Sequence, residues 1–214
     1  AVTKAAVSNY ASYEQLVGGV ETLFGSSAGI VQDYAANAYK TAGLSANAYM
    51  ETVTSFSASL LQSLDGDTKA AAEKADMAIT DMSDNANKMG TSMESLQTTY
   101  AGFAKQNFTM LDNLKLGYGG TKEEMQRLLD DATKLSGIEY DISSYADIVD
   151  AIHVVQTEMG ITGTTAKEAS TTIEGSISAA KGAFSNLMTG LADENADLDA
   201  LIADMIAAAE TVVD

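Results

Sequence analysis

Three glycines lie close together in the stretch LKLGYGGTKEEMQRLL, residues 114–129, directly before a segment with helical spacing. Gly117, Gly119 and Gly120, followed by Thr121 and Lys122, have the outline of a loop that binds phosphate. A P-loop, however, requires Gly-x4-Gly-Lys-Ser/Thr after a buried strand, and the dinucleotide fingerprint requires a third glycine where Lys122 stands. Neither spacing is present. The sequence therefore predicts a helix that is capped by Thr121, and no nucleotide site.

The single histidine, His153, lies between Ile152 and Val154, beside an apolar stripe. One histidine cannot form the usual His-x3-His metal pair, and no nucleophile-elbow motif accompanies it. We therefore expect a packed or half-exposed structural histidine rather than a catalytic one.

The acidic stretch DENADLD, residues 193–199, places Asp193, Asn195 and Asp197 at the first three ligand positions of a calcium loop. The sixth position, which needs glycine, is Leu198, and the twelfth is Asp204 instead of a bidentate glutamate. The stretch is better explained as an acidic helix start. With cysteine also absent, we expect no catalytic, cofactor-binding or metal-binding residue, and no enzyme.

Composition favours helices and argues against nucleic acid as a direct partner. The 214 residues include no proline, where about 5% is ordinary, and proline is the residue that breaks helices. There are 12 basic and 30 acidic residues, so the net charge is -18. Direct DNA binding requires clustered Lys and Arg, and no apolar run approaches the length of a spanning helix.

Apolar residues recur at intervals of three and four along the whole chain, which predicts amphipathic helices. In the middle of the chain the stripes consist of Tyr49, Val53, Phe56 and Leu60, of Ala75, Ile79, Met82, Ala86 and Met89, of Met93, Leu96, Tyr100 and Phe103, of Met125, Leu128, Ala132 and Leu135, and of Ile148, Ile152, Val155 and Met159. Two further stripes near the end of the chain consist of Ile173, Ile177, Ala180, Phe184, Leu187 and Leu191, and of Leu198, Leu201, Met205, Ala209 and Val212. Capping boxes are expected at Ser12/Gln15, Thr91/Glu94, Thr121/Glu124 and Thr165/Glu168, further N-caps at Ser45 and Asp67, and helix ends at Gly25, Gly43, Gly90, Gly137 and Gly160.

These signals predict an all-α fold, a bundle of roughly nine short-to-medium helices. Residues 1–191 are expected to form the bundle and residues 192–214 a terminal, acidic-capped helix that leads into the rest of a longer chain. The missing initiator methionine also points to a fragment. Gly18 and Gly19 fall inside a helix, which leaves two explanations open: a close helix contact, or a soft point in a chain that changes shape.

Four long segments carry a resemblance to a known family. They are YEQLVGGVETLFG (13–25), AYKTAGLSANAYMETVTSFSASLLQSL (38–64), ADMAITDMSDNANKMGTSMESLQTTYAGFAKQNFTMLDNLKLGYGGTKEEMQRLL (75–129) and AIHVVQTEMGITGTTAKEASTTIEGSISAAKGAFSNLMTGLADEN (151–195). Over roughly residues 10–200 the chain resembles one helical region of the tail tape-measure proteins of long-tailed phages and prophages of Gram-positive bacteria.

The resemblance implies a structural role in the virion. Tape-measure proteins occupy the tail lumen, set tail length and assist genome delivery. Their partners would be the tail tube protein, tail assembly chaperones, tail-tip proteins and further copies of the same chain, with host envelope contact during ejection. The implied location is the tail lumen, and the host cytoplasm during assembly. The family has no defined catalytic residues in this region, so none is carried over.

Two alternatives from other classes remain open at this stage. A generic helical interaction or scaffold module would explain the same stripes without any tail role. A secreted helical toxin should contain a hydrophobic hairpin able to enter a membrane, and the sequence shows none.

Overall fold

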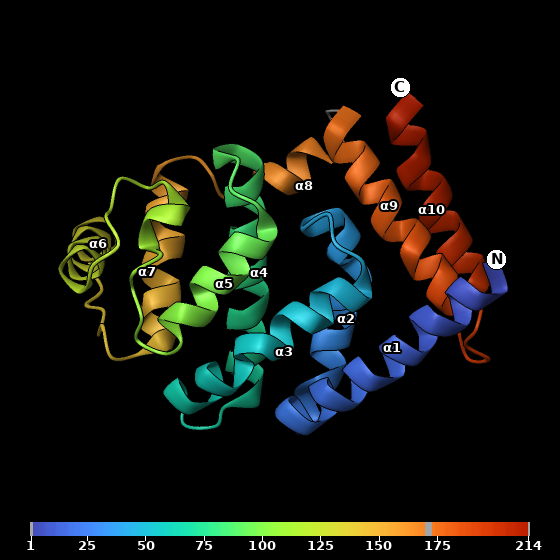
Figure 1. Ribbon diagram of the computed structural model, residues 1–214, viewed down its shortest axis with the longest axis horizontal. Helices are drawn as coiled ribbons and strands as arrows, with labels where there is room; N and C mark the ends of the chain where they lie inside the picture. Colours follow the sequence, from blue (N-terminus) through green and yellow to red (C-terminus); the bar gives the residue numbers. More distant parts are fainter. Residues whose placement is uncertain (1, 170–172, 214) are drawn as a thin grey trace. The chain divides into compact units, whose positions relative to one another are not determined.

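The computed structural model describes residues 2–169 and 173–213, and every regular element in these ranges is a helix (Figure 1). Nine α-helices have 11 residues or more, α8 (Thr164–Glu168) has five, and two short 3-10 helices complete the described part. The predicted all-α fold is confirmed. The chain forms two compact units, one made of Ala1–Thr54 with Thr165–Asp214 and the other of Ser55–Thr164.

The first unit contains helices from both ends of the sequence. From the amino-terminal segment come α1 (Val2–Phe24), η1 (Gly25–Ser27), α2 (Ala28–Thr41) and the beginning of α3 (Ala46–Ser63). From the carboxyl-terminal segment come most of α8, α9 (Ile173–Gly190) and α10 (Leu198–Val213). Helix α9 packs against α1, α2 and α10, so it holds the two segments together.

Helix α9 packs through its small residues, which corrects the predicted stripe. Ile177, Phe184 and Leu191 were expected inside, but their exposed fractions are 38%, 54% and 49%. The buried side instead carries Ala179, Gly182 and Ala183 among others. A Cβ atom added to Gly182 would lie 2.9 Å from the Cβ of Tyr39. The side of α9 with small residues is buried because it lets the backbones of α9 and α2 approach closely, whereas larger side chains would hold the two helices apart.

The predicted apolar stripe of α10 is also corrected, but by a smaller rotation around the helix. Its partly buried Met205 packs on the cluster of Tyr39, Ala183 and Ala208, whereas the predicted Leu198 is 36% exposed. The buried alanine is Ala208, one position before the predicted Ala209. The side chains of Ile173 and Val212, which belong to the predicted stripes, lie outside the part that the structure describes.

The second unit contains the end of α3, then α4 (Thr68–Met89), α5 (Met93–Phe103), η2 (Leu111–Leu114), α6 (Lys122–Ser136) and α7 (Tyr145–Glu158). Helix α4 packs against α5 and α7, and α7 also packs against α6. Apolar side chains predicted on one face of each helix form the core: Phe56, Leu60, Ala75, Ile79, Met82, Leu96, Tyr100, Phe103, Met125, Leu128, Ala132, Ile148, Ile152 and Val155. Only at helix ends do predicted core residues become exposed, at Leu135 and Met159.

Capping chemistry starts several helices as predicted. Asp67 accepts hydrogen bonds from two backbone amides at the start of α4, and Thr121 Oγ1 accepts one from Glu124 N at 3.2 Å. Ser45 Oγ accepts one from the backbone amide three residues later, at 3.3 Å. Positive φ angles occur at all five glycines predicted to end helices, namely Gly25, Gly43, Gly90, Gly137 and Gly160. Local sequence therefore sets most helix ends.

Three predicted capping boxes are wrong. Ser12 lies inside α1, where its hydroxyl donates back to Ser8 O. Helix α5 begins one residue later than expected, with Ser92 as N-cap, and Thr91 instead donates to Asn113 O at 2.7 Å. Thr165 lies inside the short helix α8. A Ser/Thr-x-x-Glu/Gln spacing marks a helix start only where the preceding residues leave the helical conformation.

The glycine pair inside α1 has two different environments. A Cβ atom on Gly19 would meet the Thr54 side chain at 3.6 Å, an ordinary contact, whereas one on Gly18 would meet nothing within 4 Å. Close packing therefore does not explain Gly18. A glycine with open space in a helix interior weakens the helix by about 1 kcal/mol relative to alanine.

Candidate functional site

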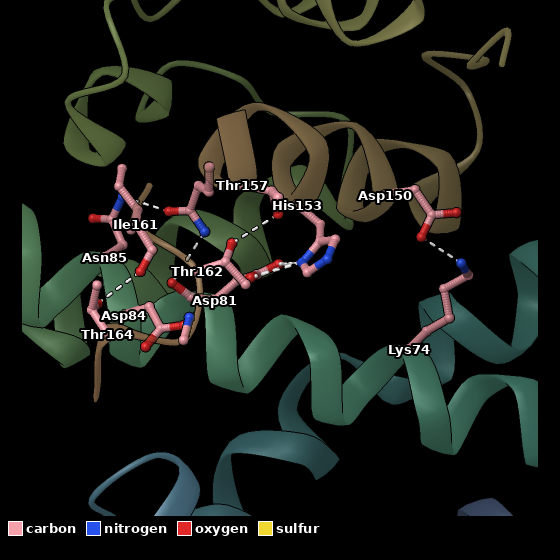
Figure 2. A network of polar contacts seen from close by, with 12 residues as sticks. Lys74, Asp81, Asp84, Asn85, Asp150, His153, Thr157, Ile161, Thr162 and Thr164 are labelled. Atoms are coloured by element: carbon pink, nitrogen blue, oxygen red, sulfur yellow. Dashed lines mark hydrogen bonds and ion pairs between the residues drawn. The ribbon is translucent and has the colours of Figure 1, made fainter. Parts of the chain in front are cut away.

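A buried polar network lies between α4 and α7 in the second unit (Figure 2). Five consecutive residues of α4, positions 81–85, are buried, although an amphipathic helix normally exposes part of each turn. They are buried because α4 is covered by α5 as well as α7. Asp81, Asp84 and Asn85 therefore lie inside the unit, at 1%, 0% and 0% exposure.

Asp81 and His153 form the central pair of the network. His153 Nδ1 lies 2.9 Å from Oδ1 and 3.0 Å from Oδ2 of the carboxylate, and the imidazole is 33% exposed. The hydrogen bond to Asp81 raises the pKa of His153 above its ordinary 6.5, against the opposing effect of partial burial. Burial raises the pKa of Asp81, and the bond to His153 opposes that rise. The pair therefore holds a proton more tightly than an isolated histidine does.

A pair of side-chain amides lies one helical turn further along. Asn85 Nδ2 donates to Gln156 Oε1 at 2.8 Å and to Leu114 O at 2.9 Å, while Gln156 Nε2 donates to Asp81 O at 3.2 Å. Gln156 is fully buried. Within the described part of the chain Asn85 Oδ1 has no partner, so this otherwise satisfied network retains one buried acceptor without a hydrogen bond.

Asp84 connects α4 to the turn that follows α7. Its Oδ2 accepts from Gly163 N at 2.6 Å, and the turn is also closed by Ile161 N, which donates to Gln156 O at 2.9 Å. Ile161 is 1% exposed, so the turn inserts an apolar anchor next to the polar contact. The carboxylate thus fixes the end of α7 against α4 (Figure 2).

Lys74 and Asp150 form the outer contact, an ion pair between side chains that are 26% and 30% exposed. With the Asp81–His153 and Asn85–Gln156 pairs it makes three cross-links that follow one another in the same order along α4 and α7. We call these three pairs the polar ladder. It specifies how far α7 can slide or rotate on α4, because a shift of one residue would leave buried polar groups unpaired.

The polar ladder can hold and release a proton at His153. Three cavities of about 240, 400 and 450 Å³ are lined by other residues. In the described residues no group of three or more acidic or histidine side chains is arranged to hold a metal ion. The same residues contain no helix long and apolar enough to cross a membrane.

The glycine-rich loop is closed by its own helix. Glu124 Oε2 accepts from Gly119 N at 2.9 Å and from Arg127 Nη2 at 2.6 Å, and the same guanidinium donates to Gly117 O at 2.7 Å. Arg127 lowers the pKa of Glu124 to about 2, and the Gly119 amide adds to this effect. The Tyr118 ring stacks on Arg127 at 4.3 Å. The Glu124 carboxylate therefore already accepts the hydrogen bond of the Gly119 amide, which a phosphate bound in this loop would need.

The acidic stretch before α10 uses its carboxylates for local backbone contacts. Asp193 Oδ1 accepts from Asn195 N, and Asp197 Oδ1 accepts from Ala200 N, both at 2.9 Å. The predicted acidic helix start is confirmed, because Asp197 satisfies a free amide in the first turn of α10.

Sequence reasoning found His153 but missed its partners. Asp81, Asn85 and Gln156 resemble ordinary polar surface positions when the sequence is read alone. A signal was present in the spacing, because Lys74, Ala78, Asp81 and Asn85 form a second stripe beside the apolar face of α4. Only the position of α7 shows that this second stripe is covered.

Comparison of the sequence with models of known protein families, with curated proteins and with solved structures finds no match.

Proposed function

We propose that this chain is a segment of a phage tail tape-measure protein, which occupies the tail lumen, sets tail length and assists genome delivery. The observation that carries the proposal is the resemblance over roughly residues 10–200. Its partners in this role are the tail tube protein, the assembly chaperones, the tail-tip proteins and other copies of the chain.

Helical structure supports the role through its regular length. A continuous helix of 214 residues would extend about 320 Å at 1.5 Å per residue, whereas the longest helix here, α1 with 23 residues, extends only about 35 Å. The folded segment is thus much shorter than the same residues would be as one continuous helix, and opening the fold would let the segment lengthen. The caps and left-handed glycines at the helix ends favour the folded form outside the tail.

The charge of the chain supports a lumen through which DNA passes. A net charge of -18 repels the phosphate backbone, so DNA following the protein would not adhere to it. A titration with duplex DNA at about 50 mM salt tests this point. Micromolar affinity that falls with rising salt would contradict it.

The deciding experiment deletes codons 1–214 in frame from the parent phage gene and measures tail length by electron microscopy. Tails shorter by about 320 Å would show that the segment is read in extended form. Unchanged length with poor infectivity would assign it to assembly or genome delivery as a folded module. Unchanged length with unchanged infectivity would contradict the proposal.

A second function, a helical module that binds a protein partner, is favoured by one observation. Six large apolar side chains on α9, on α10 and directly after the end of α9 are 36% to 54% exposed. The third outcome of the deletion experiment would leave this function in place, because it requires no tail.

A further inference from the structure

Helices α9 and α10 pack side by side as a helical hairpin (Figure 1). One surface of this hairpin carries large apolar side chains that are partly exposed. We call this surface the hairpin face. It consists of Ile177 and Phe184 on α9, Leu191 directly after the end of α9, and Leu198, Ile202 and Ile206 on α10, with exposed fractions between 36% and 54%. Scattered exposed apolar residues need no explanation, but six on one helical hairpin indicate a contact surface.

The two halves of the hairpin face lie on the same side of the hairpin. On α9, Gly182 packs against α2, and Phe184 is about 200° further around the helix. On α10, Asp204 pairs with Lys40 of α2, and Ile202 and Ile206 are about 160° to 200° away from it. Both helices therefore present Phe184, Ile202 and Ile206 away from α2, and these three side chains remain 42% to 54% exposed.

The area of the hairpin face suits a partner of its own size. A Phe side chain carries on the order of 150–250 Å² and a Leu or Ile side chain somewhat less, so the six at these exposures leave on the order of 500 Å² of apolar surface accessible. A specific interface buries about 800 Å² on each partner, with an apolar centre and a polar margin. The hairpin face supplies such a centre.

Charged residues along its two edges are opposite in sign. Lys181 lies at the α9 edge, about 40° beyond Ile177, and Glu210 lies at the α10 edge, about 40° beyond Ile206, with Asp199 about 20° beyond Ile206. Gly190 lies beside Leu201, and Ala183 shares a core cluster with Ala208. This antiparallel register places Glu210 level with Lys181.

We propose that the hairpin face is a dimer interface that binds the hairpin face of a second copy of this chain. A two-fold axis parallel to the helices puts α9 of each copy over α10 of the other, which makes a four-helix bundle with a shared apolar centre. In that arrangement Lys181 of each copy meets Glu210 of the other. The other two-fold arrangement, with α9 over α9, would place Lys181 against Lys181 and Glu210 against Glu210. Charge repulsion therefore disfavours it, and the α9-over-α10 arrangement is the one that the charges favour.

The proposal concerns the isolated chain and does not rest on a role in a phage tail. Sedimentation velocity of the purified 214-residue chain, at concentrations up to about 0.1 mM and about 0.15 M salt, should show a species of twice the 22.3 kDa of one chain. Phe184→Glu and Ile202→Lys should each weaken dimerisation by on the order of tenfold or more. Ile138→Glu, a substitution at a 59% exposed site in the other unit, is the control and should leave the dimer unchanged.

A charge exchange tests the arrangement itself. Lys181→Glu should weaken the dimer, and adding Glu210→Lys in the same chain should restore it, while circular dichroism shows that every variant keeps its helices. A monomer at all concentrations, or a dimer that survives Phe184→Glu and Ile202→Lys, would overturn the proposal. A dimer that Lys181→Glu weakens and the double exchange does not rescue would overturn the α9-over-α10 arrangement.

Discussion

The two amides of the polar ladder provide the sharpest test of how the second unit is held together. Gln156→Leu removes the acceptor of Asn85 Nδ2, a bond of 2.8 Å, and the donor to Asp81 O. One buried N–H of Asn85 then has no partner, which costs about 1–3 kcal/mol. The leucine itself fits a fully buried site. We expect a net loss of about 2 kcal/mol in the free energy of unfolding.

The double variant Asn85→Leu/Gln156→Leu should lose less than the sum of the two single variants. The shared hydrogen bond is counted in both single losses, and replacing both partners by apolar groups leaves fewer orphaned atoms. We expect a coupling of about 1–2 kcal/mol in this cycle. The cost that persists in the double variant comes from Leu114 O, which loses the donor it had at 2.9 Å.

Hydrogen exchange of peptides from α4 and α7 is the suitable measurement, because it reports on the second unit alone. Gln126→Leu is the matched control. Gln126 is exposed on α6, where it donates to Asp130, so its replacement should change stability by no more than about 0.5 kcal/mol. Additivity of Asn85→Leu and Gln156→Leu within about 0.5 kcal/mol would refute the claim that the amides act as one network.

Four further predictions concern single sites. The hydrogen bond to Asp81 raises the pKa of His153 above 6.5. The stability that this bond adds is therefore fully present below pH 6.5 and is lost as the pH rises through the folded-state pKa of His153. His153→Gln should remove this pH dependence from the hydrogen-exchange rates of α7. Gly18→Ala should stabilise the chain by about 0.5–1 kcal/mol in thermal unfolding, since its Cβ meets nothing within 4 Å. Gly182→Ala, by contrast, should destabilise it, because its Cβ would fall 2.9 Å from a neighbouring side chain. Asp67→Ala should cost about 1 kcal/mol, seen as faster exchange in the first turn of α4, and unchanged exchange there would contradict its role as N-cap.

Local features of the fold followed from the sequence because they depend on a few neighbouring residues. Thr121 and Asp67 cap helices through atoms two or three positions away, and Gly90 and Gly137 end helices through their own backbone angles. The apolar stripes of the second unit were also correct, since each of those helices has one clearly larger apolar face.

The side on which α9 packs could not be read from its own sequence. Hydrophobicity favoured the side with Phe184, but the outcome depended on the close approach of α2 to Gly182, a contact between residues far apart in the chain. The polar ladder could not be predicted either, because its pairs join residues that are far apart in the chain. Asp81 resembles a surface acid until His153, 72 positions later, is seen beside it.

The order of the two units along the chain has a mechanical consequence. One unit is built from both ends of the sequence, and the other is inserted between Thr54 and Thr165. Tension applied to the two ends is carried by the packing of α9 against α1 and α2, so the inserted unit bears no load while these contacts hold. Once they separate, the force reaches Ser55 and Thr164, and the inserted unit opens second.

Synthesis imposes the reverse sequence of events. All residues of the inserted unit are made before α9 and α10 and leave the ribosome ahead of them, so this unit can begin to fold while its neighbour is still incomplete. The part of the chain that is able to fold first is therefore the part that pulling opens last.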